Sequence, residues 1–188
     1  MLIIYAHPNH LGHCGFILNQ VERQLTDKGI GYEILDLYAM NYDPILHQNE
    51  HYTSGNHVIS SENQQLQEKI KQTDQFIFIY PSWWNNMPAI LKGFIDRVFT
   101  NHFAFEYRGR FPVGLLKGKA TIFTSTGAKR WVTRWIQGDR VVKILTKDTL
   151  RFCGIKTKAY LIDNATKLTD KQKQKIQHSV KKGLQNIM

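Results

Sequence analysis

The sequence predicts an α/β fold in which helices cover both faces of a central parallel sheet. Two observations support this prediction. Stretches typical of strands and of helices alternate along the chain, with five strands in all, and the strands at 2–6 and 75–80 are continuous apolar runs, as expected of strands that are buried on both faces. The chain has 188 residues and contains no internal repeat or low-complexity linker, so we expect one domain that covers residues 1–188.

The first half of the chain is expected to contain three of the strands, at 2–6, 32–38 and 75–80. Between the first two strands a helix is expected to end at Gly29, because apolar residues recur at helical spacing before it: Cys14, Leu18, Val21 and Leu25. The connection from the second strand to the third is long and polar. Its end, over residues 62–72, is expected to form a crossover helix, and its start is expected to be a surface excursion.

The second half of the chain is expected to add two strands, at 119–126 and 157–163. A helix over 87–99 places a proline in its first turn, where the missing N–H does no harm. Another helix is expected over 140–154, where a glycine provides the C-terminal cap. The last helix is expected to open with two residues at capping-box spacing, Thr169 and Gln172.

Charge and composition restrict the kind of protein. The net charge is +10, and much of the excess lies on the polar face of the last helix, which is typical of a solvated surface rather than of a nucleic-acid-binding patch. No apolar run reaches the ~20 residues that a membrane span needs. Only two cysteines are present, Cys14 and Cys153, and the N-terminal stretch lacks the features of a signal peptide. We therefore expect a cytoplasmic protein that neither spans a membrane nor binds nucleic acid.

Three loops are expected to leave the carboxyl ends of parallel strands, at 7–15, 81–87 and 124–131, where open α/β sheets bind their ligands. In the first loop, HPNHLGHCG, glycines permit close approach of the backbone, and the helix that follows offers free N–H groups to an anion. This pattern favours a phosphate site, to which three histidines could add hydrogen bonds: His7, His10 and His13. Coordination of a metal ion by these histidines is the alternative, although no carboxylate accompanies them.

The second loop, PSWWNNMP, contains two adjacent tryptophans where small polar residues are usual. Trp83 and Trp84 could bracket a flat aromatic ligand, because offset stacking and edge contacts suit such rings. Ser82 and Asn85 could form hydrogen bonds with the edge of a heterocycle. The alternative is that either indole packs in the core or at a dimer contact.

The third loop, TSTGAKRW, combines a glycine that tolerates close approach of a ligand with nearby cations. Lys129, Arg130 and Arg134 make this region a candidate for binding a phosphate-bearing cosubstrate. The alternative is an ordinary polar turn that is followed by solvated surface charges.

Several motifs along the chain occur together in one known family. The most specific is YPSWWNNMPAILKGFIDRVF at residues 80–99, and it is accompanied, in the same order as in the family, by YAHPN, DLYAMNYDPIL, FAFEY, LLKGKA, STG and FCG. Over residues 2 to about 165 the chain resembles the flavodoxin-like NAD(P)H:quinone oxidoreductases, which are the DT-diaphorase group and its short bacterial relatives. The resemblance implies a flavodoxin-like three-layer sandwich with a sheet of order 2-1-3-4-5, and a homodimer with flavin sites at the subunit interface.

The resemblance also implies which residues bind the cofactor. The flavin phosphate would be held by His7 and by the start of the first helix, at His13, Cys14, Gly15 and Phe16. The isoalloxazine ring would lie against the second loop, at Pro81, Ser82, Trp83, Trp84 and Asn85. Its polar edge would meet the third loop, at Ser125, Thr126, Gly127 and Ala128. No metal ion is implied.

The chain departs from the family pattern at several positions. Family members often have Ser or Thr in the phosphate loop, whereas this chain has HCGF, so His13 and backbone amides would substitute. Cys14 is expected to be a small buried residue rather than a redox centre. The Tyr and His of larger members are missing after the third loop, with Gln137 in the place of the His and Trp131 as the candidate for the Tyr. The connection between the second and third strands is shorter than in the FAD-binding members of the family, which use it to hold the adenine, and this favours FMN, with FAD as the alternative.

The function that the resemblance implies is a two-electron flavoenzyme. NAD(P)H, and then a quinone or another flat acceptor, would use the same face of the flavin in a ping-pong reaction. Phe103, Phe105 and Tyr107 are expected at the edge of that pocket or at the dimer contact. The alternative function is a flavin-binding ancillary subunit that regulates a membrane transporter with little turnover. The sequence leaves open the physiological acceptor and the preference between NADH and NADPH.

Overall fold

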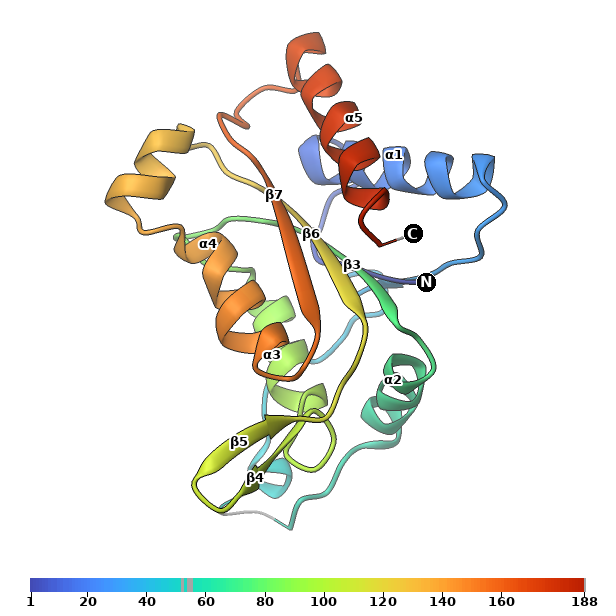
Figure 1. Ribbon diagram of the computed structural model, residues 1–188, viewed down its shortest axis with the longest axis vertical. Helices are drawn as coiled ribbons and strands as arrows, with labels where there is room; N and C mark the ends of the chain where they lie inside the picture. The colour runs from blue at the N-terminus through green and yellow to red at the C-terminus, as the bar shows by residue number, and fades with distance from the viewer. Residues whose placement is uncertain (52, 54–55, 188) are drawn as a thin grey trace.

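The computed structural model describes residues 1–51, 53 and 56–187, and at its centre is a twisted five-stranded sheet (Figure 1). All neighbouring strands pair in parallel, in the order β2-β1-β3-β6-β7. In this order, the strands are β2 (Glu33–Asp36), β1 (Leu2–Tyr5), β3 (Gln75–Pro81), β6 (Lys119–Ser125) and β7 (Lys156–Ile162). The predicted order 2-1-3-4-5 is confirmed, with β6 and β7 as its fourth and fifth strands.

The sheet has a hydrophobic core on each face because its strands are apolar on both sides. Alternate residues of a strand divide between the two cores. Ile4 and Phe78 face one core, whereas Ile3 and Ile77 face the other. None of these four side chains is more than 1% exposed. This double burial explains why the strands are continuous apolar runs in the sequence.

Helices cover both faces of the sheet, as predicted. α1 (His13–Asp27) and α5 (Asp170–Leu184) pack side by side on one face (Figure 1). The other face is covered by α2 (Ser61–Lys71), α3 (Ala89–Val98) and the segment that begins with α4 (Arg140–Lys143). The layers are therefore helix, sheet and helix. Among the described residues, no helix is long and apolar enough to cross a membrane.

The C-terminal helix begins where the capping-box spacing predicted, but only half of the box forms. Thr169 Oγ1 accepts a hydrogen bond from Gln172 N over 3.3 Å at the start of α5. The Gln172 side chain does not return this bond, because its amide donates to the carbonyls of Asp163 (3.1 Å) and Asn164 (3.0 Å). The start of the last helix is thereby fastened to the loop that follows β7.

Two elements differ from the predicted pattern. An antiparallel hairpin of β4 (Phe105–Arg108) and β5 (Phe111–Gly114) lies below the sheet in Figure 1. The predicted helix over 140–154 is present as far as Arg151, but it is α-helical only in α4 and continues as a π-helix over Ile144–Arg151. In this wider helix the Thr149 hydroxyl donates to the carbonyl five residues earlier over 2.9 Å.

The start of the long connection after β2 is held against α3 by a buried ion pair. Arg97 of α3 donates from Nε and Nη2 to the two carboxylate oxygens of Glu50, over 2.9 and 2.8 Å. Neither side chain is more than 9% exposed. The guanidinium also donates to the Asp43 carbonyl and lies 5.6 Å from the centre of the Tyr42 ring. The expected surface excursion is therefore anchored to the core at its start.

Replacing Arg97 by methionine should lower the free energy of unfolding by about 3 kcal/mol, because the Glu50 carboxylate would stay buried without its partner. Burial opposes ionisation of Glu50, but the hydrogen bonds from Arg97 and from the His47 backbone, together with the charge of Arg97, outweigh it and hold the Glu50 pKa below its ordinary value. The ion pair therefore stabilises the fold above the unfolded pKa of ~4.3, and this effect is lost as the pH falls through the folded pKa. Urea titrations at pH 7 and pH 3 measure the contribution of this ion pair to the free energy of unfolding.

The difference between wild type and Arg97→Met should shrink at pH 3. The double variant Arg97→Met/Glu50→Gln is the matched control, since it removes the uncompensated charge and should recover part of the loss at pH 7. A loss of equal size at both pH values, or no recovery in the double variant, would contradict this account.

Candidate functional site

The carboxyl ends of β1, β3 and β6 lie next to one another, and the chain leaves the sheet there in three loops. The chain first moves from β1 outward to β2 and then returns to place β3 on the other side of β1, so the strand order reverses at this point. Backbone hydrogen bonds join the starts of these loops, from Ala6 N to Ile79 O (3.0 Å) and from Ser82 N to Ser125 O (2.6 Å). Open parallel sheets bind their ligands at such a switch point.

A cleft of about 340 Å³ opens at this edge, which is within the range of ligand sites. It brings together predicted residues from all three loops: His7, His13, Cys14, Pro81, Ser82, Trp83, Ser125, Thr126 and Gly127. Leu11, Gly12 and Ala165 also line it and were not among the predicted site residues. Ala165 follows β7. The predicted parallel sheet could have pointed to this residue, because it brings the carboxyl end of β7 to the same edge as the three loops.

Other predicted residues do not line this cleft: Gly15, Phe16, Trp84, Asn85 and Ala128. Gly15 is buried in the first turn of α1, where an added Cβ would lie 1.6 Å from the His10 carbonyl oxygen. Asn85 is turned toward a neighbouring segment, since its Nδ2 donates to the Gln137 carbonyl over 3.4 Å. In front of Gly127, by contrast, an added Cβ would meet nothing closer than 3.8 Å, so its backbone is open to a ligand.

The first loop is fixed by hydrogen bonds of its own. Asn9 N donates to His7 Nδ1 over 3.0 Å, and Tyr5 Oη donates to the Asn9 carbonyl over 3.1 Å. His10 Nε2 lies 2.6 Å from Asp36 Oδ2, at the end of β2. The described part of the chain contains no group of three His, Cys, Asp or Glu side chains that could hold a metal ion. The loop is therefore preorganised, and His10 is tied to β2.

Among the described residues, no side chain caps the backbone N–H groups at the start of α1. Its cap residue is Gly12, at φ 103°, which provides no side-chain hydrogen bond, and no acidic residue lies in its first turn. His13, the first residue of α1, has a buried Nε2 atom without a hydrogen-bond partner among the described residues. Burial lowers the pKa of His13, and a hydrogen bond with the Lys167 backbone acts in the opposite sense. Free N–H groups, the helix dipole and this imidazole make the position suitable for an anion.

The two tryptophans of the second loop point in different directions because a tight turn separates them. Trp83 and Asn86 exchange two backbone hydrogen bonds, both of 3.0 Å, and the two residues between them have positive φ angles. This is a two-residue turn of type I′ geometry. Trp83 lines the cleft, with its ring centre 6.0 Å from that of His7, whereas Trp84 is fully exposed. Only one of the two indoles therefore forms a wall of the cleft in a single chain.

The thiol in the cleft is not poised for chemistry. Cys14 Sγ lies 3.5 Å from Ser125 Oγ, and only 2% of the residue is exposed. Burial raises the pKa of Cys14 to about 12, although the hydrogen bond with Ser125 acts against this rise. The thiol is therefore protonated at neutral pH, which agrees with the expectation of a small buried helix residue.

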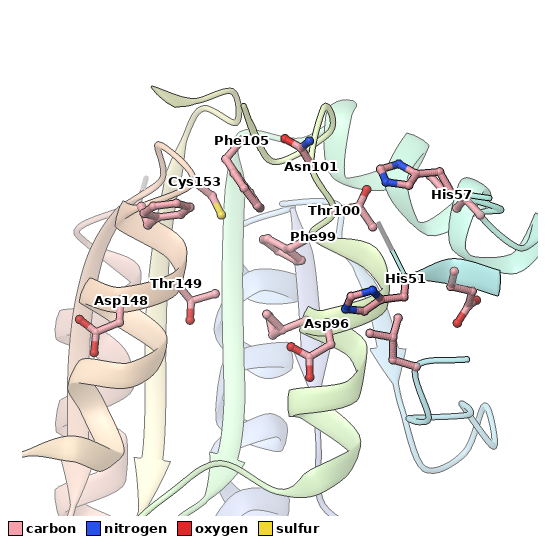
Figure 2. A pocket seen from close by; sticks show the side chains of 15 residues that line it. His51, His57, Asp96, Phe99, Thr100, Asn101, Phe105, Asp148, Thr149 and Cys153 are labelled. Atoms are coloured by element: carbon pink, nitrogen blue, oxygen red, sulfur yellow. The ribbon is translucent and has the colours of Figure 1, made fainter. Parts of the chain in front are cut away.

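A second cavity, of about 290 Å³, lies at the far end of α3 (Figure 2). Phe99, which follows α3, and Phe105 of β4 line it together with Phe152, which ends the π-helical segment. The rings of Phe105 and Phe152 meet edge to face, with centres 5.1 Å apart. None of the predicted cofactor-binding residues belongs to this cavity.

The cleft at the switch point lies between an uncapped helix start on one side and an indole on the other. The geometry of this α/β cleft suits a planar ligand with an anionic group. A family model described as "Flavodoxin-like fold" matches residues 1–187, and the chain therefore belongs to this family. The fold and the family that the sequence motifs indicated are both confirmed.

Relatives of the chain carry the names of oxidoreductases. An uncharacterized NAD(P)H oxidoreductase of Haemophilus influenzae is 41% identical over 119 residues, which cover 63% of this chain and 59% of that protein. The ribosyldihydronicotinamide dehydrogenase (quinone) of Homo sapiens is 32% identical over 197 residues, which cover 93% of this chain and 85% of that protein. A crystal structure from Streptococcus mutans has a TM-score of 0.87 at 35% identity, covering 99% of this chain and 98% of that one. None of these names supports the alternative of a transporter subunit.

Proposed function

We propose that this chain is a flavin-dependent NAD(P)H:quinone oxidoreductase that acts as one flavin-binding domain. The observation that carries the proposal is the meeting of the three loops at the switch point, around a cleft with Trp83 as one wall. The names of the relatives, which include both an NAD(P)H oxidoreductase and a quinone dehydrogenase, support the reaction. The acceptor would be a quinone or a similar flat aromatic molecule.

The start of α1 is the proposed phosphate site. Its free backbone N–H groups and the unpartnered His13 Nε2 offer the anion a site that no side chain of the described chain occupies. The backbone of Gly127 and the hydroxyls of Ser125 and Thr126 would meet the polar edge of the ring. Trp83 would lie against the ring itself, where stacking contributes to affinity.

A bound flavin supplies the hydride chemistry, and the chain binds and orients the reactants. Because the cleft at Trp83 serves both the nicotinamide donor and the acceptor, the two occupy it in turn, which makes the kinetics ping-pong. The backbone amides of Ser82, Trp83, Thr126 and Ala128 already donate within the protein. The amide of Gly127, which lines the cleft, would stabilise negative charge on the ring by its oriented dipole. Cys14 would take no part in the reaction, because its thiol is buried and protonated.

FMN is the flavin that we propose, with FAD as the alternative. The connection between β2 and β3 is shorter than the FAD-binding members of the resembled family have, and its start is fastened to α3 by Arg97 and Glu50. Little of this connection is therefore left to hold an adenine. We also propose a cytoplasmic location, which the two free and buried cysteines support.

A homodimer is part of the proposal. Trp84, Tyr107 and Phe111 are large, exposed and outside the cleft of their own chain. Aromatic side chains of this kind are enriched in protein interfaces. Tyr107 and Phe111 belong to the β4–β5 hairpin, and the second cavity lies beside this hairpin at Phe105 (Figure 2). In the proposed dimer, the aromatic residues of this hairpin in one copy would close the flavin cleft of the other.

Purified protein should absorb in the flavin bands after incubation with FMN, and it should oxidise NAD(P)H when menadione is supplied. Mass spectrometry of the cofactor released by heating decides between FMN and FAD, and initial-rate patterns at several donor concentrations test the ping-pong order. A protein that stays colourless with both flavins and gains no thermal stability from them would refute the proposed function.

Replacing Trp83 by alanine should weaken FMN binding about tenfold, because one face of the ring would lose its aromatic wall. The comparison is Trp135→Ala, which removes an exposed indole that does not line the cleft and should leave the Kd for FMN unchanged. Fluorescence titration of the apoprotein with FMN measures both values. Equal Kd values for Trp83→Ala and wild type would contradict the placement of the flavin ring against this loop.

The affinity for FMN should rise as the pH falls from 8 toward the ordinary histidine pKa of ~6.5. Burial lowers the pKa of His13 in the free protein, whereas a neighbouring phosphate favours the protonated imidazole, so binding takes up a proton. FMN titrations at several pH values measure the slope of the affinity against pH, and this slope should be lost in His13→Gln. Riboflavin, which has no phosphate, is the control ligand. A slope for riboflavin as steep as that for FMN would exclude His13 as the phosphate partner.

A further inference from the structure

A third cleft opens beyond the loop that follows β6. Its volume is about 510 Å³, and its walls include Lys129, Arg130, Trp131, Arg134 and Trp135. Most of this segment forms a short π-helical turn at residues 132–136. The cleft is therefore built from the stretch of chain that directly follows the proposed edge of the flavin site.

This cleft shares a wall with the flavin cleft. Ala165 N donates to Thr126 O over 2.9 Å, and Asn164 N donates to Ala128 O over 3.0 Å. Gly127 and Ala165 line the flavin cleft, whereas their neighbours Lys129 and Asn164 line the third cleft. The two clefts therefore adjoin along residues 127–129 and 164–165, so that a long ligand could place one end in each.

The carboxylates at this cleft already have partners. Asp163, which lines it, receives hydrogen bonds from Lys175 and from Arg130 N (2.9 Å). Burial opposes ionisation of Asp163, but these bonds outweigh it and hold the Asp163 pKa below its ordinary value. Asp139 in turn pairs with the guanidinium of Arg130. Both carboxylates therefore already have cationic or N–H partners within the protein.

Two cations remain uncompensated. Within the described parts of the chain, no carboxylate forms an ion pair with Lys129 or Arg134. The guanidinium of Arg134 lies 5.4 Å from the centre of the Trp135 ring. Trp131 and Trp135 are 56% and 76% exposed. The cleft thus offers two indole surfaces and two free positive charges, which complement a ligand that carries both a flat ring and phosphates.

We propose that this cleft binds the adenosine-phosphate half of the reduced dinucleotide donor, through Lys129 and Arg134, with the indoles against the adenine. The proposal rests on the proposed function, because the nicotinamide must reach the flavin cleft. It names the residues that select NADH and NADPH over ribosyldihydronicotinamide, a donor without phosphates. The remaining positive charge favours the donor with more phosphate groups, so NADPH gains more from the cleft than NADH.

The test uses the flavin-loaded double variant Lys129→Gln/Arg134→Gln with menadione as acceptor. The KM for NADPH should rise at least tenfold and the KM for NADH by a smaller factor, while kcat and flavin content stay as in wild type. The KM for ribosyldihydronicotinamide should not change. The control is Lys181→Gln/Lys182→Gln in the last turns of α5, which removes the same net charge elsewhere and should leave every KM unchanged.

Different outcomes overturn different statements. An unchanged KM for both dinucleotides in a flavin-loaded variant overturns the assignment of this cleft alone, as does an equal rise in KM for the phosphate-free donor. Size-exclusion chromatography provides a further readout: a variant that dissociates while wild type is dimeric would make the cleft a subunit contact and overturn the assignment. A wild type that binds no flavin overturns the proposed function, and the donor site with it.

Discussion

Burial of β3 between β1 and β6, on both faces of a parallel sheet, is the constraint on which the rest of the structure depends. Parallel neighbours cannot be joined by hairpins, so each connection must cross a face of the sheet and return. Every strand therefore ends at the same edge, and the loops after β1, β3, β6 and β7 gather there. The cleft follows from this topology, and the sequence needs only to place suitable residues at the ends of the strands.

The strands could be predicted because their signals are local, whereas their order was implied by the family resemblance. Each strand is an apolar run, and each helix has its own periodicity. The hairpin at residues 105–114 gave no such signal, because its strands are four residues each and partly exposed. The π-helix over 144–151 keeps an apolar pattern close to that of an α-helix, so the sequence could not separate the two. The link between Arg97 and Glu50 joins residues that are 47 positions apart, and only tertiary packing determines it.

The candidate site was predicted in part for the same reason. Composition singled out the three loops, and the sheet brings them together around one cleft. The direction of each side chain depends on backbone angles that the sequence does not reveal. Trp84 faces away from the cleft because it lies at φ 51° in a two-residue turn, where residues other than glycine are uncommon. The unpartnered atom of His13 likewise becomes visible only when the packing around α1 is known.

The tryptophans of this protein all lie outside its two hydrophobic cores. There are four of them, each at least 40% exposed, and each follows the carboxyl end of β3 or β6: Trp83, Trp84, Trp131 and Trp135. Indole emission under ultraviolet light therefore originates entirely at one rim of the molecule. A change in its intensity or colour reports on what touches that rim, whereas loosening of the interior alters it only indirectly. Tryptophan fluorescence of this protein should therefore follow ligand binding at the rim, whereas calorimetry measures its thermal unfolding more directly.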